Sequence, residues 1–182
     1  MRLFIAIHFP EEIKSALRAI RNSLKESALC GNFTSDENLH LTLVFLGECD
    51  NYQTGIIKSV MNEVLFPAFQ LLLEKAGYFK RDGGNTWWVG LKDNKTLSDL
   101  QANLTRRLKQ KGFLLENRNY KPHVTIGREV KLRSGFVQPE VQQIGFNVSS
   151  IELMTSERIN GKMTYRAIYQ KQCVPLHSNV QT

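Results

Sequence analysis

His40-Leu41-Thr42-Leu43 and His123-Val124-Thr125-Ile126 are two copies of one pattern, in which a histidine and a threonine alternate with apolar residues. Each copy lies in an apolar run that predicts a buried strand. Successive side chains of a strand point to opposite faces, so the His and the Thr of each copy share one face. Burying these polar groups without partners is costly. We therefore expect the polar face of each strand to meet water, a partner or a ligand.

The surroundings of the two copies repeat as well. The order strand, helix, polar approach and His-x-Thr strand occurs twice, and the same number of residues separates Ile5 from His40 and Trp88 from His123. Identity between the halves is slight, which indicates a structural duplication rather than a repeat array. We expect one domain over residues 1–182 with duplicated halves at about 1–80 and 81–174. A pseudo-two-fold axis between the halves would place the two His–Thr pairs facing each other across a groove. Alternatively, the two motif strands are unrelated strands of the core.

Periodicity and end signals predict the other elements. Strands are expected over residues 3–9, 69–79 and 86–91, with a closing pair over 147–156 and 164–170. Helices are expected to begin at Pro10, at Asp50 or Asn51, and at a capping box that starts at Thr96. The first helix is expected to end at residues 30–32. Residues 33–38 and 116–121 are polar approaches to the motif strands, residues 137–144 are expected to form a short helix or loop, and the tail after Cys173 is expected to fray.

Composition narrows the class of protein. The chain has 182 residues, of which 42% are hydrophobic and 23% charged, as in ordinary globular proteins. No apolar run reaches the ~18 residues of a membrane span, and the N-terminus does not fit a signal peptide. Three cysteines without C-x-x-C spacing argue against a disulfide framework or a zinc ribbon and predict a cytoplasmic protein. The net charge of +7 favours a polyanionic partner, although many basic proteins bind no nucleic acid.

Two histidines at matched positions indicate acid–base chemistry. A lone histidine on a strand is usually structural. With an unperturbed pKa of ~6.5, however, histidine serves as neutral base or as charged acid near neutral pH. In-line displacement at phosphorus needs a neutral base and a charged acid. The base takes a proton from the entering oxygen, and the acid protonates the leaving oxygen. The two threonine hydroxyls would then donate to the non-bridging phosphate oxygens.

With these motifs the chain resembles the 2H phosphoesterases, in particular the bacterial and archaeal RNA 2′,3′-cyclic phosphodiesterases, long labelled 2′-5′ RNA ligases. The matching stretches are residues 2–7 (RLFIAI) with Pro10, 38–43 (NLHLTL), 45–48 (FLGE), 122–126 (PHVTI) with Arg128, and 161–165. They occur in the family's order over nearly the whole chain. Phe33 departs from the Trp of many members, and Val44 departs from a common basic residue.

The resemblance implies an α+β fold in which two pseudo-symmetric lobes of antiparallel sheet, with outer helices, line a groove. It implies hydrolysis of a terminal ribose 2′,3′-cyclic phosphate on RNA or nucleotides to a 2′-phosphate, with no cofactor or metal. It also implies that His40 and His123 are catalytic and that Thr42, Thr125 and Arg128 bind the phosphate. The resemblance favours His40 as the acid, whereas the residues alone leave that assignment open. We expect a monomer without membrane attachment.

Other functions compete with this interpretation. The same groups could join RNA ends through a 2′-5′ bond by microscopic reversibility. An RNA-binding module would keep the groove without chemistry, but pure binding needs no paired acid and base. One His and one Thr per strand are a poor ligand set for zinc. Nucleotide-fuelled ligation lacks support because the chain has no P-loop.

Aromatic and basic residues outside the motifs are weaker candidates. Phe9, near the expected groove mouth, is a base-stacking candidate. Alternation predicts that one of Trp87 and Trp88 is buried and the other exposed, and core packing is the favoured interpretation for the pair. The cluster formed by Arg106, Arg107, Lys109 and Lys111 is interpreted as a solvated helix end that complements the helix dipole. Structural or exposed roles are expected for His8 and His177.

Overall fold

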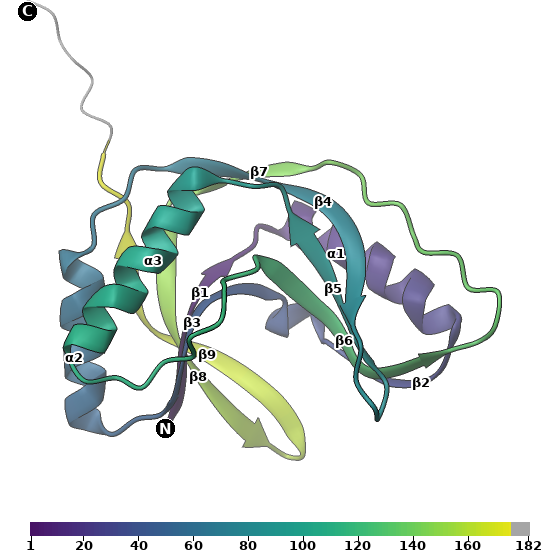
Figure 1. The fold of residues 1–182 in the computed structure, drawn as a ribbon, viewed down its shortest axis with the longest axis horizontal. Helices are drawn as coiled ribbons and strands as arrows, with labels where there is room; N and C mark the ends of the chain where they lie inside the picture. The colour runs from purple at the N-terminus through teal and green to yellow at the C-terminus, as the bar shows by residue number, and fades with distance from the viewer. Residues whose placement is uncertain (176–182) are drawn as a thin grey trace, which may run out of the picture.

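A computed structural model describes residues 1–175 and shows an α+β fold with two antiparallel sheets and helices on the outside (Figure 1). The strands are β1 (Arg2–His8), β2 (Ala28–Phe33), β3 (His40–Glu48), β4 (Phe69–Phe79), β5 (Asn85–Leu91), β6 (His123–Leu132), β7 (Gly145–Val148), β8 (Ser150–Ile159) and β9 (Lys162–Gln172). The helices are α1 (Glu11–Glu26), α2 (Asn51–Glu63) and α3 (Lys95–Gln110), with a short 3-10 helix at Asp36–Asn38. The two-lobed α+β prediction is confirmed. His177 and the end of the tail lie outside the described residues.

Within residues 1–175, each lobe contains one of the two motif strands. The first sheet has the order β3-β1-β8-β9, and the second has the order β2-β6-β5-β4-β7. β1 pairs with β3, which carries His40, and β5 pairs with β6, which carries His123. In each case a helix lies between the two paired strands in the chain. The two pairs are therefore equivalent units of the predicted pseudo-symmetry.

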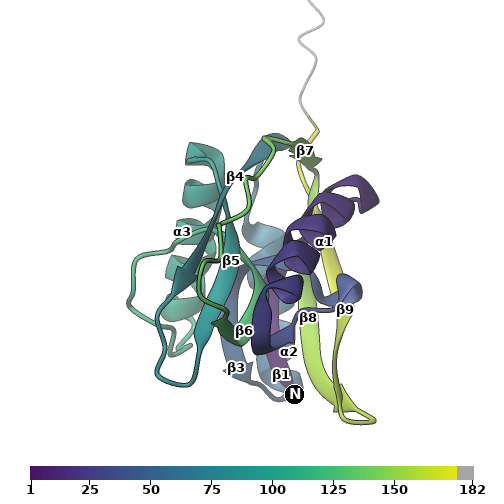
Figure 2. The same ribbon diagram turned by 90° about the vertical axis from the view of Figure 1, so that its right-hand side faces the viewer.

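The lobes exchange elements between the sequence halves. β2 and β4 come from the first half of the chain but lie in the second sheet, whereas β8 and β9 complete the first sheet. α1 follows β1 yet contacts β2 and β6, and α3 follows β5 yet contacts β3. Figure 2 shows α1 and α3 on opposite sides of the molecule with strands between them. A boundary near residue 80 therefore divides the sequence but does not separate the two lobes.

The first two helices begin where local chemistry predicts. Pro10 precedes α1 and Glu11 lies in its first turn, near the positive end of the helix dipole. Asp50 caps α2 through a full capping box with Gln53. α1 buries the apolar stripe that its spacing predicts, which comprises Ile13, Leu17, Ile20 and Leu24.

Three predicted boundaries are wrong. α3 is capped by Asn94, whose side chain accepts from the Leu97 amide, so Thr96 lies inside the helix. α1 ends at Glu26, because residues 28–33 form β2 against β6. Residues 147 and 148 belong to β7, which pairs with β4 in the second sheet, so only β8 closes with β9. These strands were missed because partners distant in sequence create them.

The remaining chain agrees with the prediction. Residues 137–144 form a loop without regular structure. The β8–β9 hairpin turns at Asn160 and Gly161, which both have positive φ, as two-residue hairpin turns require. In the described part of the chain, no helix is long and apolar enough to cross a membrane.

Candidate active site

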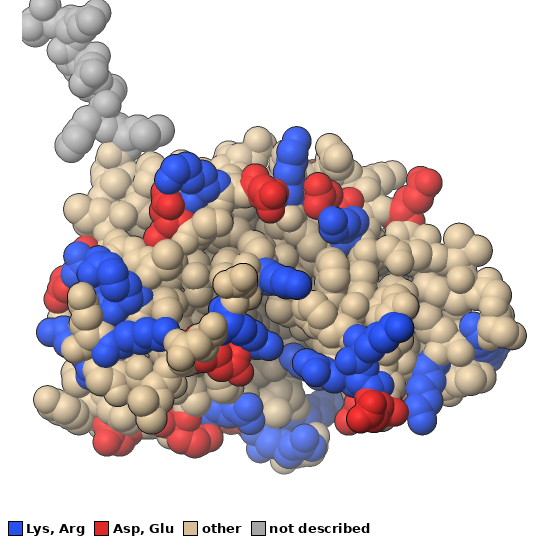
Figure 3. All heavy atoms as spheres, in the orientation of Figure 1, with Lys and Arg blue, Asp and Glu red and all other residues tan. Residues whose placement is uncertain are grey.

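The two motif strands approach each other where the lobes meet, since β3 contacts β6 across the sheet boundary. His40 and Thr42 are half-buried while Leu41 is fully buried, and the second motif alternates in the same way. The positive charge of His123 lowers the pKa of His40. Around the hollow on the face drawn in Figure 3, Lys and Arg side chains gather. The strands that carry the two His–Thr pairs therefore lie close together.

Backbone carbonyl groups hold both imidazoles in the same way. Nδ1 of His40 lies 2.7 Å from the carbonyl oxygen of Asn38, and Nδ1 of His123 lies 2.6 Å from that of Lys121. A carbonyl only accepts, so Nδ1 carries the proton of the neutral ring in both cases. Nε2 then remains for other partners, and in His40 it lies 3.0 Å from the Thr42 hydroxyl. Both rings thus turn the same nitrogen away from the backbone.

Aromatic rings enclose each histidine. Phe4 and Tyr165 lie 4.9 Å and 5.1 Å from the His40 ring centroid. Phe79 and Trp88 lie 5.2 Å and 6.4 Å from the His123 centroid. Each imidazole therefore has two aromatic neighbours that exclude water from part of its surface. Sequence reasoning did not assign these neighbours.

Trp88 reaches this place because glycines make room for its ring. Trp87 is only 3% exposed, as alternation predicts for one of the pair. Trp88 lies opposite Gly77, where an added Cβ would come within 2.5 Å of its ring, and Gly90 is similarly close at 3.1 Å. Two glycines inside neighbouring strands are the sequence signal that could have located this ring.

Burial controls the protonation of His40. It lowers the pKa of His40 from the ordinary 6.5 to about 4, although the bond to the Asn38 carbonyl acts in the opposite direction. The positive charges of His8, Arg128 and His123 lower this pKa further. His40 is therefore neutral at pH 7 in the free protein.

His123 shifts in the same direction. Burial is again the main cause of its lowered pKa, and the charges of Arg118 and Arg128 add to it. Because the pKa of each imidazole is lowered, an anion bound beside the rings would act in the opposite direction and favour the protonated form. The expectation of two histidines poised near 6.5 needs this correction.

His8 lies nearer to the site than its expected structural role implied. It pairs directly with His40 across β1 and β3. Its Nδ1 lies 3.8 Å from Oε2 of Glu152, which forms an ion pair when His8 is protonated.

A bulge brings Arg128 to the groove. In the pairing of β5 with β6, Thr125 lies opposite Trp88 and Gly127 lies opposite Trp87, so Ile126 is an extra residue. Strict alternation would place Arg128 on the face opposite Thr125, but one extra residue reverses the faces beyond it. Arg128 is exposed, its charge lowers the pKa of both motif histidines, and no carboxylate within residues 1–175 forms an ion pair with it.

The first motif has the same bulge and exposes Phe45. Thr42 lies opposite Ala6 and Val44 lies opposite Ile5, which leaves Leu43 as the extra residue. Phe45 therefore occupies the position in β3 that Arg128 occupies in β6. It is 46% exposed, and the guanidinium carbon of Arg2 lies 4.9 Å from its ring centroid. Sequence reasoning missed Phe45, although its equal offset from the motif threonine was visible.

The base-stacking prediction for Phe9 is wrong. Phe9 is only 5% exposed and packs edge-to-face against Phe146, with ring centroids 5.2 Å apart. It continues the core-facing series of Leu3, Ile5 and Ile7. Strand parity therefore directs it away from the groove.

Hydroxyl groups tie each motif to the approach segment of the other half. The Thr34 hydroxyl donates to the Thr125 carbonyl at 2.9 Å, and the Tyr120 hydroxyl donates to the Thr42 carbonyl at 3.0 Å. Burial raises the pKa of Tyr120, which keeps its hydroxyl protonated as a donor. The two crossing bonds hold the motif threonines at a fixed separation.

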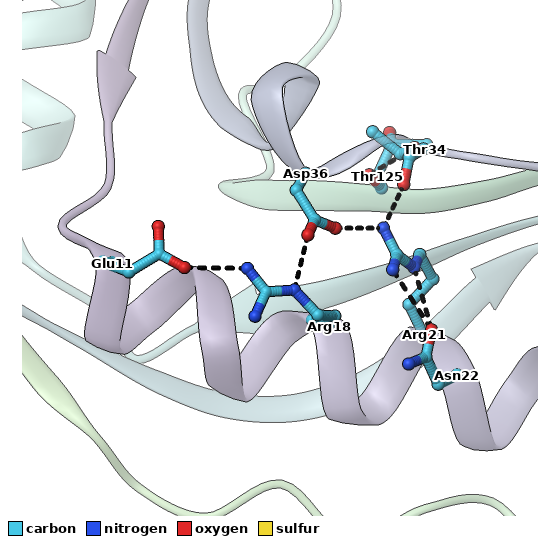
Figure 4. A network of polar contacts seen from close by, with 7 residues as sticks. All are labelled: Glu11, Arg18, Arg21, Asn22, Thr34, Asp36 and Thr125. Carbon is cyan, nitrogen blue, oxygen red and sulfur yellow. Dashed lines mark hydrogen bonds and ion pairs between the residues drawn. The ribbon is translucent and has the colours of Figure 1, made fainter.

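The network around Thr34 is anchored on α1. Arg21 donates to the Thr34 carbonyl at 2.7 Å and to Asp36 at 2.6 Å, and Arg18 donates to the other oxygen of Asp36 (Figure 4). Figure 4 shows these residues between α1 and the strand of Thr125. The charged pairs lower the pKa of Asp36 although partial burial opposes this. α1 therefore fixes the first approach segment.

Comparison with known proteins assigns the family. A sequence model of the 2′-5′ RNA ligase superfamily matches residues 9–160. Curated relatives named RNA 2′,3′-cyclic phosphodiesterase include those of Thermotoga maritima (37% identity over 131 residues, 70% of each chain) and Archaeoglobus fulgidus (34% over 152 residues, 82% of each chain). The structure of Escherichia coli LigT complexed with 3′-AMP superposes with a TM-score of 0.84 at 25% identity, covering 96% of this chain and 98% of that one. The chain belongs to the 2′-5′ RNA ligase superfamily.

A crossing hydroxyl bond should contribute measurably to stability. We expect Tyr120→Phe to lower the free energy of unfolding by about 1–3 kcal/mol, because the partly buried Thr42 carbonyl loses its donor. Urea denaturation followed by tryptophan fluorescence measures this change. Tyr52→Phe is the matched control, since Tyr52 is 78% exposed. Equal stability of the two variants would contradict the role of this bond.

The lowered pKa values predict the pH dependence of a reaction at this site. The plot of kcat/KM against pH should be bell-shaped. Because the pKa of each imidazole in the free protein lies below 6.5, its maximum should lie below pH 6.5. The bell-shaped plot of kcat against pH should have its maximum at higher pH, because a bound phosphate anion raises the pKa of both imidazoles. Steady-state kinetics with a nucleoside 2′,3′-cyclic phosphate across the acid and neutral range measures both profiles. A kcat maximum on the acid side of the kcat/KM maximum would contradict this interpretation.

Proposed function

We propose that this protein is an RNA 2′,3′-cyclic phosphodiesterase that converts a terminal ribose 2′,3′-cyclic phosphate into a 2′-phosphate. One observation carries the proposal: two imidazoles with the same backbone anchor lie on the contacting strands β3 and β6, and Nε2 of His40 lies 3.0 Å from the Thr42 hydroxyl. The charge of Arg128, which forms no ion pair within the described part of the chain, lowers the pKa of both rings. The names of the relatives in several species point to the same reaction.

The reaction uses each ring once. Nε2 of His123 takes a proton from a water molecule while the oxygen of that water attacks phosphorus. The bond between phosphorus and the 3′-oxygen breaks. Nε2 of protonated His40 gives its proton to that 3′-oxygen, so the phosphate remains on the 2′-oxygen. Thr42, Thr125 and Arg128 hold the non-bridging oxygens, where negative charge develops. A water molecule is consumed, and the two imidazoles exchange protonation states.

The acid depends on substrate binding. His40 is neutral in the free protein because burial holds its pKa at about 4. A bound phosphate anion favours the imidazolium form. Protonation of His40 is therefore coupled to occupancy of the groove.

Ligation is the second candidate, because the superfamily name refers to 2′-5′ joining. A 5′-hydroxyl that takes the place of the attacking water would yield a 2′-5′ bond with the same proton transfers. Incubation of a cyclic-ended RNA with a 5′-hydroxyl RNA separates the two activities. An RNA-binding module would give neither product.

We propose that Phe45, in place of Phe9, is the residue on which the base of the terminal nucleotide stacks. It lies two strand positions beyond Thr42 once the bulge is counted, roughly 7 Å along the strand. Its ring faces the groove side of the first sheet, opposite Phe4 in the register. The base of the terminal nucleotide would stack there while its cyclic phosphate lies at Thr42.

We also propose that the protein works as a cytoplasmic monomer. One chain supplies both motifs, so the site needs no second copy. Cys30, Cys49 and Cys173 are free thiols, which suits a reducing compartment.

Removing either histidine should abolish most activity. We expect His40→Ala and His123→Ala each to lower kcat by ~10²–10⁴, because each removes one proton transfer. The double variant should lose less than the product of the two single losses, since the groups act as a unit. Initial rates on nucleoside 2′,3′-cyclic phosphates, with the product isomer identified, measure this. Circular dichroism checks the fold, and full activity in either variant would overturn the mechanism.

Replacing Phe45 should weaken substrate binding without changing chemistry. Base stacking contributes ~1–3 kcal/mol, so Phe45→Ala should raise KM roughly 5- to 150-fold while kcat changes little. Phe45→Trp should keep the wild-type KM. 1-O-Methylribose 2,3-cyclic phosphate has no base, so Phe45→Ala should leave its kinetics unchanged. An equal loss on both substrates would contradict base stacking, and Tyr52→Ala is the control for an exposed aromatic residue.

A further inference from the structure

A second groove lies outside the catalytic one, between α3 and residues 116–120. It encloses about 680 Å³ and is lined mainly by cationic and amide side chains. The lining residues that matter here are Gln101, Arg106, Lys109, Asn117, Arg118 and Tyr120. We call this feature the α3 groove. The sequence interpretation treated its helical cations as a solvated helix end.

Two side chains that line the α3 groove bond to the outer edge of the first motif strand. Gln101 donates to the Leu43 carbonyl at 3.3 Å, and Tyr120 donates to the Thr42 carbonyl at 3.0 Å. Both side chains also line the groove. A ligand in the α3 groove would thus lie across β3 from the motif threonine.

The opposite wall connects the groove to the second motif. Residues 116–120 form this wall, and the next residue, Lys121, holds His123 through its carbonyl. Arg118 lines the groove, and its charge also lowers the pKa of His123. The same segment therefore borders both the groove and the catalytic ring.

Among residues 1–175, no carboxylate forms an ion pair with Arg106 or Lys109, the helical cations that line the groove. Arg106 is held by the amide oxygens of Asn103 at 2.8 Å and Gln110 at 3.3 Å, and Lys109 is held by that of Asn117. Amides orient these cations without neutralising them. Arg107, by contrast, does not line the groove and is paired with Glu63 at 2.6 Å. Figure 3 shows Lys and Arg over this side of the molecule and around the central hollow.

Arg118 is the cation of the wall that has a carboxylate partner, because Glu116 lies 2.5 Å from it. The groove is therefore positive, because Arg118 is paired with a carboxylate whereas Arg106 and Lys109 are not. It is also rich in hydrogen-bond donors, because several amide side chains line it. A polyanion with regularly spaced phosphates fits these features. Ribose hydroxyls and base edges would take the amide contacts.

We propose that the α3 groove binds the RNA strand on the 5′ side of the terminal nucleotide. The inference rests on the proposed function, because it takes the cyclic phosphate to lie between Thr42 and Thr125. The strand would pass from Phe45 over the free edge of β3 into the groove. Arg106 and Lys109 would each contact a backbone phosphate that a mononucleotide does not have.

The test compares a mononucleotide with an oligonucleotide that ends in the same cyclic nucleotide. In the variant Arg106→Gln/Lys109→Gln, we expect kcat/KM for the oligonucleotide to fall roughly tenfold or more. The log–log salt slope of oligonucleotide binding should become shallower by about 1.4, on the single-strand value of about 0.7 per phosphate contact. Kinetics on the mononucleotide should stay unchanged, because it does not reach the groove.

Lys14→Gln/Lys25→Gln is the matched control. It removes the same charge from α1, which lies on the opposite side of the molecule from α3 (Figure 2). This control should leave both substrates unaffected. An equal loss in the two double variants would mean that net charge, not the groove, attracts RNA, and would overturn the proposal.

The outcomes separate this inference from the proposed function. Unchanged oligonucleotide kinetics in the groove variant, with normal mononucleotide hydrolysis, would overturn the groove and leave the enzyme assignment intact. If the wild type hydrolyses neither substrate, the proposed function fails. Fluorescence anisotropy with a 5′-labelled oligoadenylate bearing a 3′-phosphate then still tests the groove. Weaker binding by the groove variant than by the α1 variant supports it, and equal binding overturns it.

Discussion

The bonds from Nδ1 of His40 and His123 to backbone carbonyls two residues earlier are the constraint on which the site depends. They fix the tautomer of each ring and turn Nε2 away from the backbone. Without them, two half-buried imidazoles could rotate, and the groove would contain no defined base. The carbonyls belong to the polar approach segments, so the course of the chain before each motif strand matters as much as the motif itself.

Those approach segments in turn depend on the opposite motif. Thr34 bonds the strand of Thr125, and Tyr120 bonds the strand of Thr42, so each lobe fixes the other. The exchange of helices between the lobes has the same effect, because α1 anchors Thr34 through Arg21. A duplicated fold with independent halves could open along its groove. Here the crossing contacts hold the two motif strands together, as the proposed displacement at phosphorus requires of its acid and its base.

The sequence predicted the parts of this site that local periodicity determines. Alternation placed each motif His and Thr on one face, and end signals located Pro10 and Asp50 at helix starts. The remaining features depend on partner strands. β2 has little periodic signal and exists because β6 offers an edge. The bulges that expose Arg128 and Phe45 arise from pairing register, which no single strand encodes. The burial of Phe9 could have been predicted, because alternation places Phe9 on the same strand face as Ile5 and Ile7.

The two halves are alike in backbone but different in chemistry, and this difference favours one assignment of roles. The Nδ1 bond of His40 is partly buried and its ring lies between Phe4 and Tyr165, whereas the equivalent bond of His123 is exposed. The attacking water has to arrive from solvent, so the more open ring suits the base. The leaving 3′-oxygen belongs to the nucleoside, whose base would stack on Phe45 in the lobe of His40. The acid is then the imidazole that the bound nucleotide itself shields from water, and its low free pKa keeps it neutral until that nucleotide arrives.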